Sequence, residues 1–110
     1  MSKYNARKVT LDGYTFDSKK EAERYVYLKL LESAGEIFNL ELQPRFELQE
    51  AFKHNGKTIR KIEYVADFRY TDKNGATVVE DVKGMQTDVY KLKRKLFLKR
   101  YGELVDFQEL

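Results

Sequence analysis

The alternation of apolar and polar residues predicts two elements in the first third of the chain. Alternating apolar residues flank the Asp-Gly pair at positions 12–13, and such a pair in that setting is a hairpin signal. Residues 17–35 instead repeat apolar side chains at helical spacing. Asp17 or Ser18 can cap the start of this segment, Ser18 and Glu21 match a capping box, and a glycine stands at its end. We therefore expect a short strand pair followed by one helix.

The middle of the chain has the two-residue period of β-strands. Residues 37–42 and 46–48 alternate, and Pro44 between them would interrupt a ladder, so two short strands are expected. Residues 58–84 predict a β-hairpin with its turn at residues 73–75. One face of this hairpin is expected to carry the apolar side chains Tyr64, Ala66, Phe68 and Tyr70.

The last third of the chain predicts a second helix over residues 87–102, capped by Thr87 or Asp88 and ended by a glycine. The side chains expected to pack this helix on a sheet are Val89, Leu92, Leu96 and Phe97. Residues 103–107 then predict a last strand. The order of helix, strands, helix and strand predicts an α+β, or mixed α/β, fold in one domain over residues 1–110, with a central mixed β-sheet flanked by helices.

Two acidic residues of the predicted hairpin, Asp67 and Asp81, are related by its turn. A three-residue loop, with Gly75 left-handed in a bulge, places Asp67 directly opposite Asp81. A two-residue Asn-Gly turn instead places Asp67 opposite Val82. Because facing carboxylates repel each other, the first register would be destabilising unless a cation lies between them.

A pair of carboxylates at this position suits a hard divalent cation. Mg²⁺ prefers carboxylate oxygens, water and phosphate, and Asp67, Asp81 and the carbonyl of Val82 can supply such ligands; Mn²⁺ is a possible substitute. Lys83 shares a strand face with Asp81, and its amine could help deprotonate a metal-bound water or stabilise charge at phosphorus. The alternative is a solvated strand face whose charged residues have no catalytic or metal-binding role.

A third acid comes from the first predicted helix. Glu21, Tyr25 and Leu28 lie at i, i+4 and i+7, so Glu21 is at the end of an apolar stripe. Two roles fit this position equally well, namely the capping box with Ser18 and a place beside the hairpin acids. The two roles are compatible.

Composition and charge narrow the class of protein. The 110 residues carry a net charge of +3 and contain no cysteine, which excludes disulfides and thiolate metal sites. No run of 18 apolar residues occurs, so we expect a cytoplasmic protein without a membrane span. Residues 1–8 are expected to form a flexible basic tail. Between Tyr90 and Tyr101 there is no acid but there are six basic residues, Lys91, Lys93, Arg94, Lys95, Lys99 and Arg100. Such a surface suits a polyanion, although an exposed solvated helix would look the same.

Five segments together carry a family resemblance. They are "FDSKKEAERYVYLKLLESAGEI", "ELQPRFEL", "YVADFRY", "VVEDVKG" and "TDVYKLKRKLF". In this order they resemble the PD-(D/E)XK nuclease superfamily, and within it a small phage and prophage family classed as a domain of unknown function. The proline of the superfamily name is absent, because Ala66 precedes Asp67.

The resemblance implies a restriction-endonuclease-like core and a Mg²⁺-dependent site, as in Holliday-junction-resolvase-like endonucleases. By matching position, Glu21 is similar to the helix acid and Asp67 to the strand acid, while Asp81 and Lys83 are similar to the acid-x-Lys pair. Gln43 resembles, more weakly, a polar residue near the site. The basic helix would then follow the phosphate backbone of DNA.

The function expected from this resemblance is hydrolysis of phosphodiester bonds by an endodeoxyribonuclease. The expected substrate is branched or structured DNA in phage replication or recombination, in the cytoplasm of an infected or lysogenic bacterial cell. A homodimer and a phage or host protein partner are both left open. Two alternatives remain: a non-catalytic nucleic-acid-binding module of nuclease fold, and an interaction factor whose basic face binds an acidic protein.

Overall fold

The computed structural model describes residues 8–82 and 86–110. Lys83 and most of the basic tail therefore lie outside the described residues. The elements in chain order are β1 (Val9–Leu11), β2 (Tyr14–Phe16), α1 (Lys19–Ser33), β3 (Ile37–Leu42), β4 (Arg45–Gln49), β5 (Phe52–His54), β6 (Lys57–Ile59), β7 (Ile62–Val65), β8 (Phe68–Asp72), β9 (Thr77–Asp81), α2 (Asp88–Tyr101) and β10 (Asp106–Glu109).

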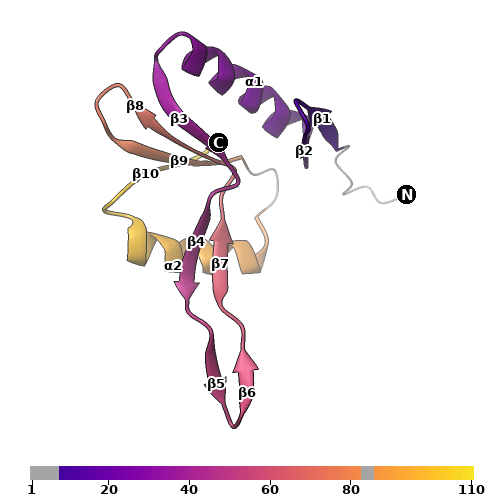
Figure 1. Ribbon diagram of the computed structural model, residues 1–110, viewed down its shortest axis with the longest axis vertical. Coiled ribbons are helices and arrows are strands. Elements are labelled where there is room, and N and C mark those ends of the chain that lie inside the picture. The colour runs from indigo at the N-terminus through magenta and orange to yellow at the C-terminus, as the bar shows by residue number, and fades with distance from the viewer. Residues whose placement is uncertain (1–7, 83–85) are drawn as a thin grey trace.

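A four-stranded sheet lies between the two helices, as Figure 1 shows. Its strand order is β10-β9-β8-β3, and β10 runs parallel to β9 while the other neighbours are antiparallel. Strand alternation gives each face its own core. Val78 of β9 packs in the core under α1, and the next residue, Val79, packs in the core under α2. The mixed α+β fold that the sequence predicted is confirmed.

The first helix begins and ends where its capping residues predict. The Ser18 hydroxyl accepts a 3.1 Å hydrogen bond from the N–H of Glu21. The returning bond of the box differs from expectation, because the Glu21 carboxylate accepts from the N–H of Asp17, at 3.4 Å. At the other end Gly35 has φ +76°, the left-handed conformation that glycine adopts without strain. The hairpin at residues 12–13 and the division of strands at Pro44 are confirmed as well.

The predicted continuous strand over residues 64–70 is wrong. β7 ends at Val65 and β8 begins at Phe68, so the strand is interrupted at positions 66–67 and the chain then pairs with different strands. β7 pairs with β4, whereas β8 pairs with β3 and β9. The four apolar residues expected on one face consequently divide between the two cores, Tyr64 and Ala66 under α2 and Phe68 and Tyr70 under α1.

The second helix has the predicted bounds but packs through a different stripe. Thr87 caps it by accepting from the N–H of Tyr90, at 3.0 Å. Of the residues expected to face the sheet only Phe97 is fully buried, and the aliphatic residues Val89, Leu92 and Leu96 are exposed. Tyr90 and Phe97 instead enter the aromatic core with Phe46 and Tyr64. Large aromatic rings bury more apolar area than aliphatic side chains, so they decide which face turns inward.

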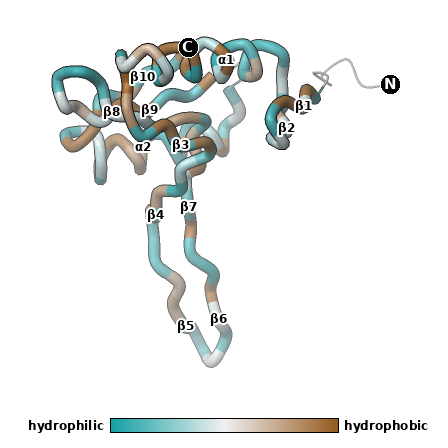
Figure 2. The backbone as a smooth tube through the Cα atoms, turned by 45° about the horizontal axis from the view of Figure 1, so that its top comes forward, coloured by the Kyte–Doolittle hydropathy of each residue, from teal (hydrophilic) through white to brown (hydrophobic). Residues whose placement is uncertain are grey.

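A two-stranded arm, defined here as residues 51–61, projects from the body and contains β5 and β6 (Figures 1 and 2). Its tip is the Asn55-Gly56 pair, with φ of +50° and +77°, a two-residue turn that joins His54 to Lys57. The sequence reading missed this hairpin although the Asn-Gly signal was present. The strands of the arm are short and polar, and their alternation is correspondingly weak.

The last strand occupies Asp106–Glu109 rather than residues 103–107, because a turn follows α2, with the N–H of Leu104 bonded to the carbonyl of Tyr101 at 2.8 Å. Within residues 8–82 and 86–110, neither helix is long and apolar enough to cross a membrane.

Candidate active site

The turn between β8 and β9 has the three-residue form. The N–H of Asp72 bonds to the carbonyl of Ala76 at 2.9 Å, and Gly75 is left-handed with φ +84°. The register pairs Phe68 with Glu80. The ladder becomes irregular beyond this pair, because the N–H of Asp67 bonds to the carbonyl of Glu80, at 3.1 Å. The expected three-residue loop is confirmed, but it does not bring Asp67 and Asp81 together on one face. Asp67 lines a pocket with Glu21 of α1, whereas Asp81 is bonded to Tyr64 in the core under α2.

Asp67, in the strand interruption before β8, has hydrogen bonds to the segments that follow two neighbouring strands. Its carboxylate accepts a 2.6 Å hydrogen bond from the N–H of Val82, and its carbonyl accepts a 2.9 Å bond from the N–H of Gln43. Asp67 therefore joins the end of β3 to the end of β9.

A pocket of about 200 Å³ contains three of the predicted site residues, Glu21, Gln43 and Asp67. They come from the first turn of α1, from the segment after β3 and from the strand interruption before β8. Leu42, Phe16 and Tyr14 supply apolar parts of the wall. Glu21 is buried, Asp67 is half-buried and Gln43 is exposed, so the acidic end of the pocket is the more enclosed. Two carboxylates in such a place are suitable ligands for a hard cation.

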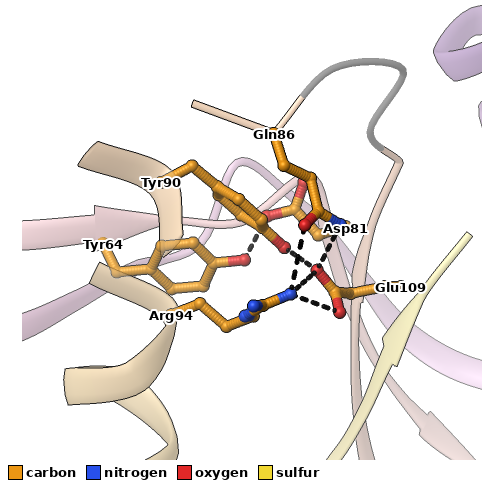
Figure 3. A network of polar contacts seen from close by, with 6 residues as sticks. All are labelled: Tyr64, Asp81, Gln86, Tyr90, Arg94 and Glu109. Carbon is orange, nitrogen blue, oxygen red and sulfur yellow. Dashed lines mark hydrogen bonds and ion pairs between the residues drawn. The ribbon is translucent and has the colours of Figure 1, made fainter. Parts of the chain in front are cut away.

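Asp81 lies on the other face of the sheet, where it is fully buried. Its carboxylate accepts a short hydrogen bond from the hydroxyl of Tyr64 (Figure 3). Burial, followed by this bond, raises the pKa of Tyr64 far above its ordinary value. The hydroxyl therefore remains a proton donor to Asp81 at any physiological pH.

The network continues from Asp81 toward the C-terminal strand. Burial raises the pKa of Tyr90, and its hydroxyl donates a 2.5 Å hydrogen bond to Glu109. The Arg94 guanidinium donates to both oxygens of Glu109, at 2.8 and 2.9 Å (Figure 3). Burial would raise the pKa of Glu109, but the bonds from Tyr90 and Arg94 outweigh it and hold that pKa below its usual value.

Glu80, the neighbour of Asp81, faces α1 and is also fully buried. Arg24 donates to its two oxygens at 2.7 and 2.6 Å, and Tyr70 donates a third, short hydrogen bond. The bond to Glu80 raises the pKa of Arg24. Sequence spacing could separate Glu80 from Asp81 but held no signal for Arg24, which is 56 residues away. This buried ion pair ties α1 to β9 beside the pocket.

The basic residues of α2 have different surroundings. Lys91, Lys95 and Lys99 are exposed, whereas Lys93 is half-buried. Arg94 is engaged with Glu109, and the guanidinium of Arg100 donates to the carbonyl of Leu48 at 3.2 Å. The exposed lysine stripe is thus the part of α2 available to a polyanion.

Among the residues that the structure describes, no group of three or more His, Asp or Glu side chains is arranged to hold a metal ion. The donors that do share a pocket are the carboxylates of Glu21 and Asp67. Val82, the source of the predicted carbonyl ligand, is buried and uses its N–H to hold Asp67. The predicted acid-x-Lys lysine, Lys83, lies outside the described ranges.

Fold and pocket together define a small mixed α+β domain with a partly enclosed acidic pocket and a basic helix. The chain belongs to the family described as "protein of unknown function (DUF1064)", whose model matches residues 1–107. A comparison with curated proteins gave no match. A comparison with solved structures gave none either.

Proposed function

We propose that the protein is a metal-dependent DNA endonuclease of the PD-(D/E)XK type, which hydrolyses phosphodiester bonds in branched or structured DNA during phage replication or recombination. One observation carries the proposal. Glu21, Gln43 and Asp67 come from three separate segments, and all three line one pocket. The superfamily resemblance assigns these same three residues to one site.

In this proposal Glu21 and Asp67, which line one pocket, would hold a Mg²⁺ ion. When bound, the ion would neutralise charge on the scissile phosphate and lower the pKa of a water molecule. The bond from Val82 fixes the orientation of the Asp67 carboxylate. Asp81 is held by Tyr64 within the aromatic core on the other face of the sheet, so in this proposal it supports the end of β9 and is not a ligand of the ion.

The remaining residues would hold the substrate. Lys91, Lys95 and Lys99 form an exposed stripe that can contact successive phosphates. Gln43 is an exposed residue of the pocket lining and can donate a hydrogen bond to a phosphate oxygen. Lys83, which follows the Val82 that binds Asp67, is proposed to stabilise charge at phosphorus.

Cleavage of plasmid and of synthetic four-way junctions in Mg²⁺ tests the proposal. We expect Asp67→Asn and Lys83→Ala to reduce cutting by at least about 100-fold, while Glu103→Gln, an exposed acid after α2, leaves it unchanged. Undiminished cutting by the Asp67 variant would exclude this site, and no cutting of any DNA by the unaltered chain would exclude the activity.

The burial of Asp81 favours a second candidate, a non-catalytic nucleic-acid-binding module. A fully buried carboxylate bonded to a tyrosine can serve the fold alone. This candidate predicts DNA binding without cleavage and no effect of Mg²⁺ or Mn²⁺ on the melting temperature. A rise in melting temperature with either metal, lost in Asp67→Asn, would count against it.

A further inference from the structure

The arm at residues 51–61 has no structural task that would explain its length. All of its residues are exposed, and among the described elements β5 and β6 contact only each other. Figures 1 and 2 show it reaching away from the sheet and from both helices. An isolated two-stranded hairpin is marginally stable in water, so a projecting arm gains from having a binding partner.

The charge of the arm indicates the class of partner. Its eleven residues contain four Lys and Arg, one His and no Asp or Glu. The basic residues are Lys53, His54, Lys57, Arg60 and Lys61. The hairpin thus concentrates positive charge, although the whole chain has a net charge of only +3. A concentration of this kind attracts a polyanion.

The geometry of the arm favours a nucleic-acid duplex over other polyanions as its partner. Phe52 pairs with Ile59 and His54 with Lys57, so these four side chains share one face, while Lys53 and Thr58 share the other. Positive side chains therefore leave both faces of a two-stranded ribbon. The major groove of B-DNA, about 12 Å wide, admits such a ribbon between two rows of phosphates. The major groove of A-form RNA is too narrow.

The base of the arm is fixed on the basic helix. The hydroxyl of Tyr101 donates to the carbonyl of Glu47 at 2.8 Å, and Arg100 donates to Leu48. Both carbonyls belong to β4, the strand that leads into β5. Because α2 and the arm are joined in this way, one DNA molecule can meet both without a rearrangement of the core.

A second copy of this chain is the competing occupant, because Phe52 and Ile59 are exposed apolar residues. Lys61 is paired with Glu63 at the base of the arm. Pairing two arms would still bring together Lys53, Lys57 and Arg60 of both copies, which electrostatic repulsion opposes. We infer that the arm is a DNA-binding ribbon that enters the major groove of double-stranded DNA. The inference rests on the proposed function in taking DNA as the ligand, and it adds a duplex segment to the substrate.

Binding without cleavage tests the inference. The full-length chain is titrated, in EDTA, against a labelled 20-base-pair DNA duplex, the matching RNA duplex and a single strand, over a range of salt concentrations. The arm variant is Lys53→Gln with Lys57→Gln. The matched control is Lys29→Gln with Lys73→Gln, which removes the same charge from α1 and from the β8–β9 turn.

We expect the arm variant to bind duplex DNA roughly tenfold more weakly at 50 mM salt. The slope of log K against log salt should also become shallower by about 2, because each of the two lost phosphate contacts contributes about 0.9 to that slope. The control should match the unaltered chain, and RNA duplex and single strand should show little effect of the arm variant. Equal binding by arm variant and control would overturn the inference, as would an equal loss on all three nucleic acids. A loss of self-association, seen by sedimentation without a change in DNA binding, would assign the arm to a second copy instead.

Cleavage in Mg²⁺ separates this inference from the proposed function. Arm-dependent duplex binding by a chain that cuts no DNA would sink the nuclease proposal and leave the ribbon intact. An arm variant that still cuts DNA and binds the duplex as tightly as the unaltered chain would keep the nuclease proposal and exclude the ribbon.

Discussion

The Asp67 carboxylate accepts a 2.6 Å hydrogen bond from the N–H of Val82, across the ends of two neighbouring strands. This bond holds the strand interruption before β8 against the end of β9. It also places the residue that precedes Lys83 in contact with an acid of the pocket.

The first prediction concerns this bond. Asp67→Asn keeps the shape of the side chain but weakens a charge-assisted bond to a neutral one, so we expect a loss of about 1 kcal/mol of unfolding free energy. Urea unfolding at pH 7 measures it, and Glu103→Gln, an exposed acid, should change it by less than about 0.5 kcal/mol. Equal effects of the two changes would mean that the bond contributes nothing to stability.

The second prediction concerns the buried ion pair of Arg24 and Glu80. Arg24→Met leaves a fully buried carboxylate without its cation, which should cost about 3 kcal/mol, at the low end for buried pairs because Arg24 is partly exposed. Lys29→Met, which breaks an exposed pair with Glu32, should cost about 0 to 1 kcal/mol.

Adding Glu80→Gln to Arg24→Met tests the reason for that loss. If the cost comes from the uncompensated charge, the double variant should regain most of it. A double variant as unstable as the single one would show that the loss arises from packing instead. Chemical denaturation of all three variants under one condition makes the comparison.

The third prediction concerns the hydroxyl that holds Asp81. Tyr64→Phe removes the donor from a buried carboxylate, so we expect a loss of about 1 to 3 kcal/mol in unfolding free energy. Tyr27→Phe is the matched control, because Tyr27 is half exposed, and it should have almost no effect. If Tyr64→Phe proved as mild as Tyr27→Phe, the Asp81 carboxylate would not depend on this donor.

The fourth prediction concerns acid stability. The pKa of Glu109 is lowered in the fold below its usual value of 4.5, so this group contributes stability above about that pH and the contribution is lost as the pH falls through the lowered pKa. The difference in unfolding free energy between the unaltered chain and Glu109→Gln should therefore be largest near neutral pH and shrink below 4.5. A difference that is constant with pH would exclude the linkage.

The fifth prediction concerns the turn that sets the register of β8 and β9. Gly75 has φ +84°, where a Cβ is strained, so Gly75→Ala should cost about 1 kcal/mol while Gly75→Asn costs less. Open space surrounds this position, so the difference would reflect backbone conformation and not a clash. Thermal melting of the two variants measures it, and equal losses would argue against the left-handed turn.

Much of the fold could be predicted from local chemistry. Ser18 and Thr87 mark the starts of the helices, Gly35 marks the end of the first helix, and Gly75 permits the three-residue loop, because caps and turns are formed by residues close in sequence. The burial of Glu21 on the stripe of Tyr25 and Leu28 also follows from helical spacing.

The candidate site was only partly accessible to the same reasoning. Spacing could present two registers for Asp67 and Asp81, and the three-residue loop of the first register is observed. It could not show that the two carboxylates lie on different faces of the sheet. It could not reveal that Tyr64 holds Asp81 in one core or that Arg24 holds Glu80 on the other face. Those partners are distant in sequence, and no local pattern encodes which distant side chain will fill a given space.

Local sequence thus determined the helices, the turns and the alternation that turns Glu80 and Asp81 to opposite faces. Tertiary structure decided where β7 ends and β8 begins, which stripe of α2 is buried, and which acids share a pocket with Asp67. The physical reason is that hydrogen bonds between neighbours in the chain are set by a few adjacent residues. Packing and charge burial, in contrast, depend on the competition among all side chains for one limited interior.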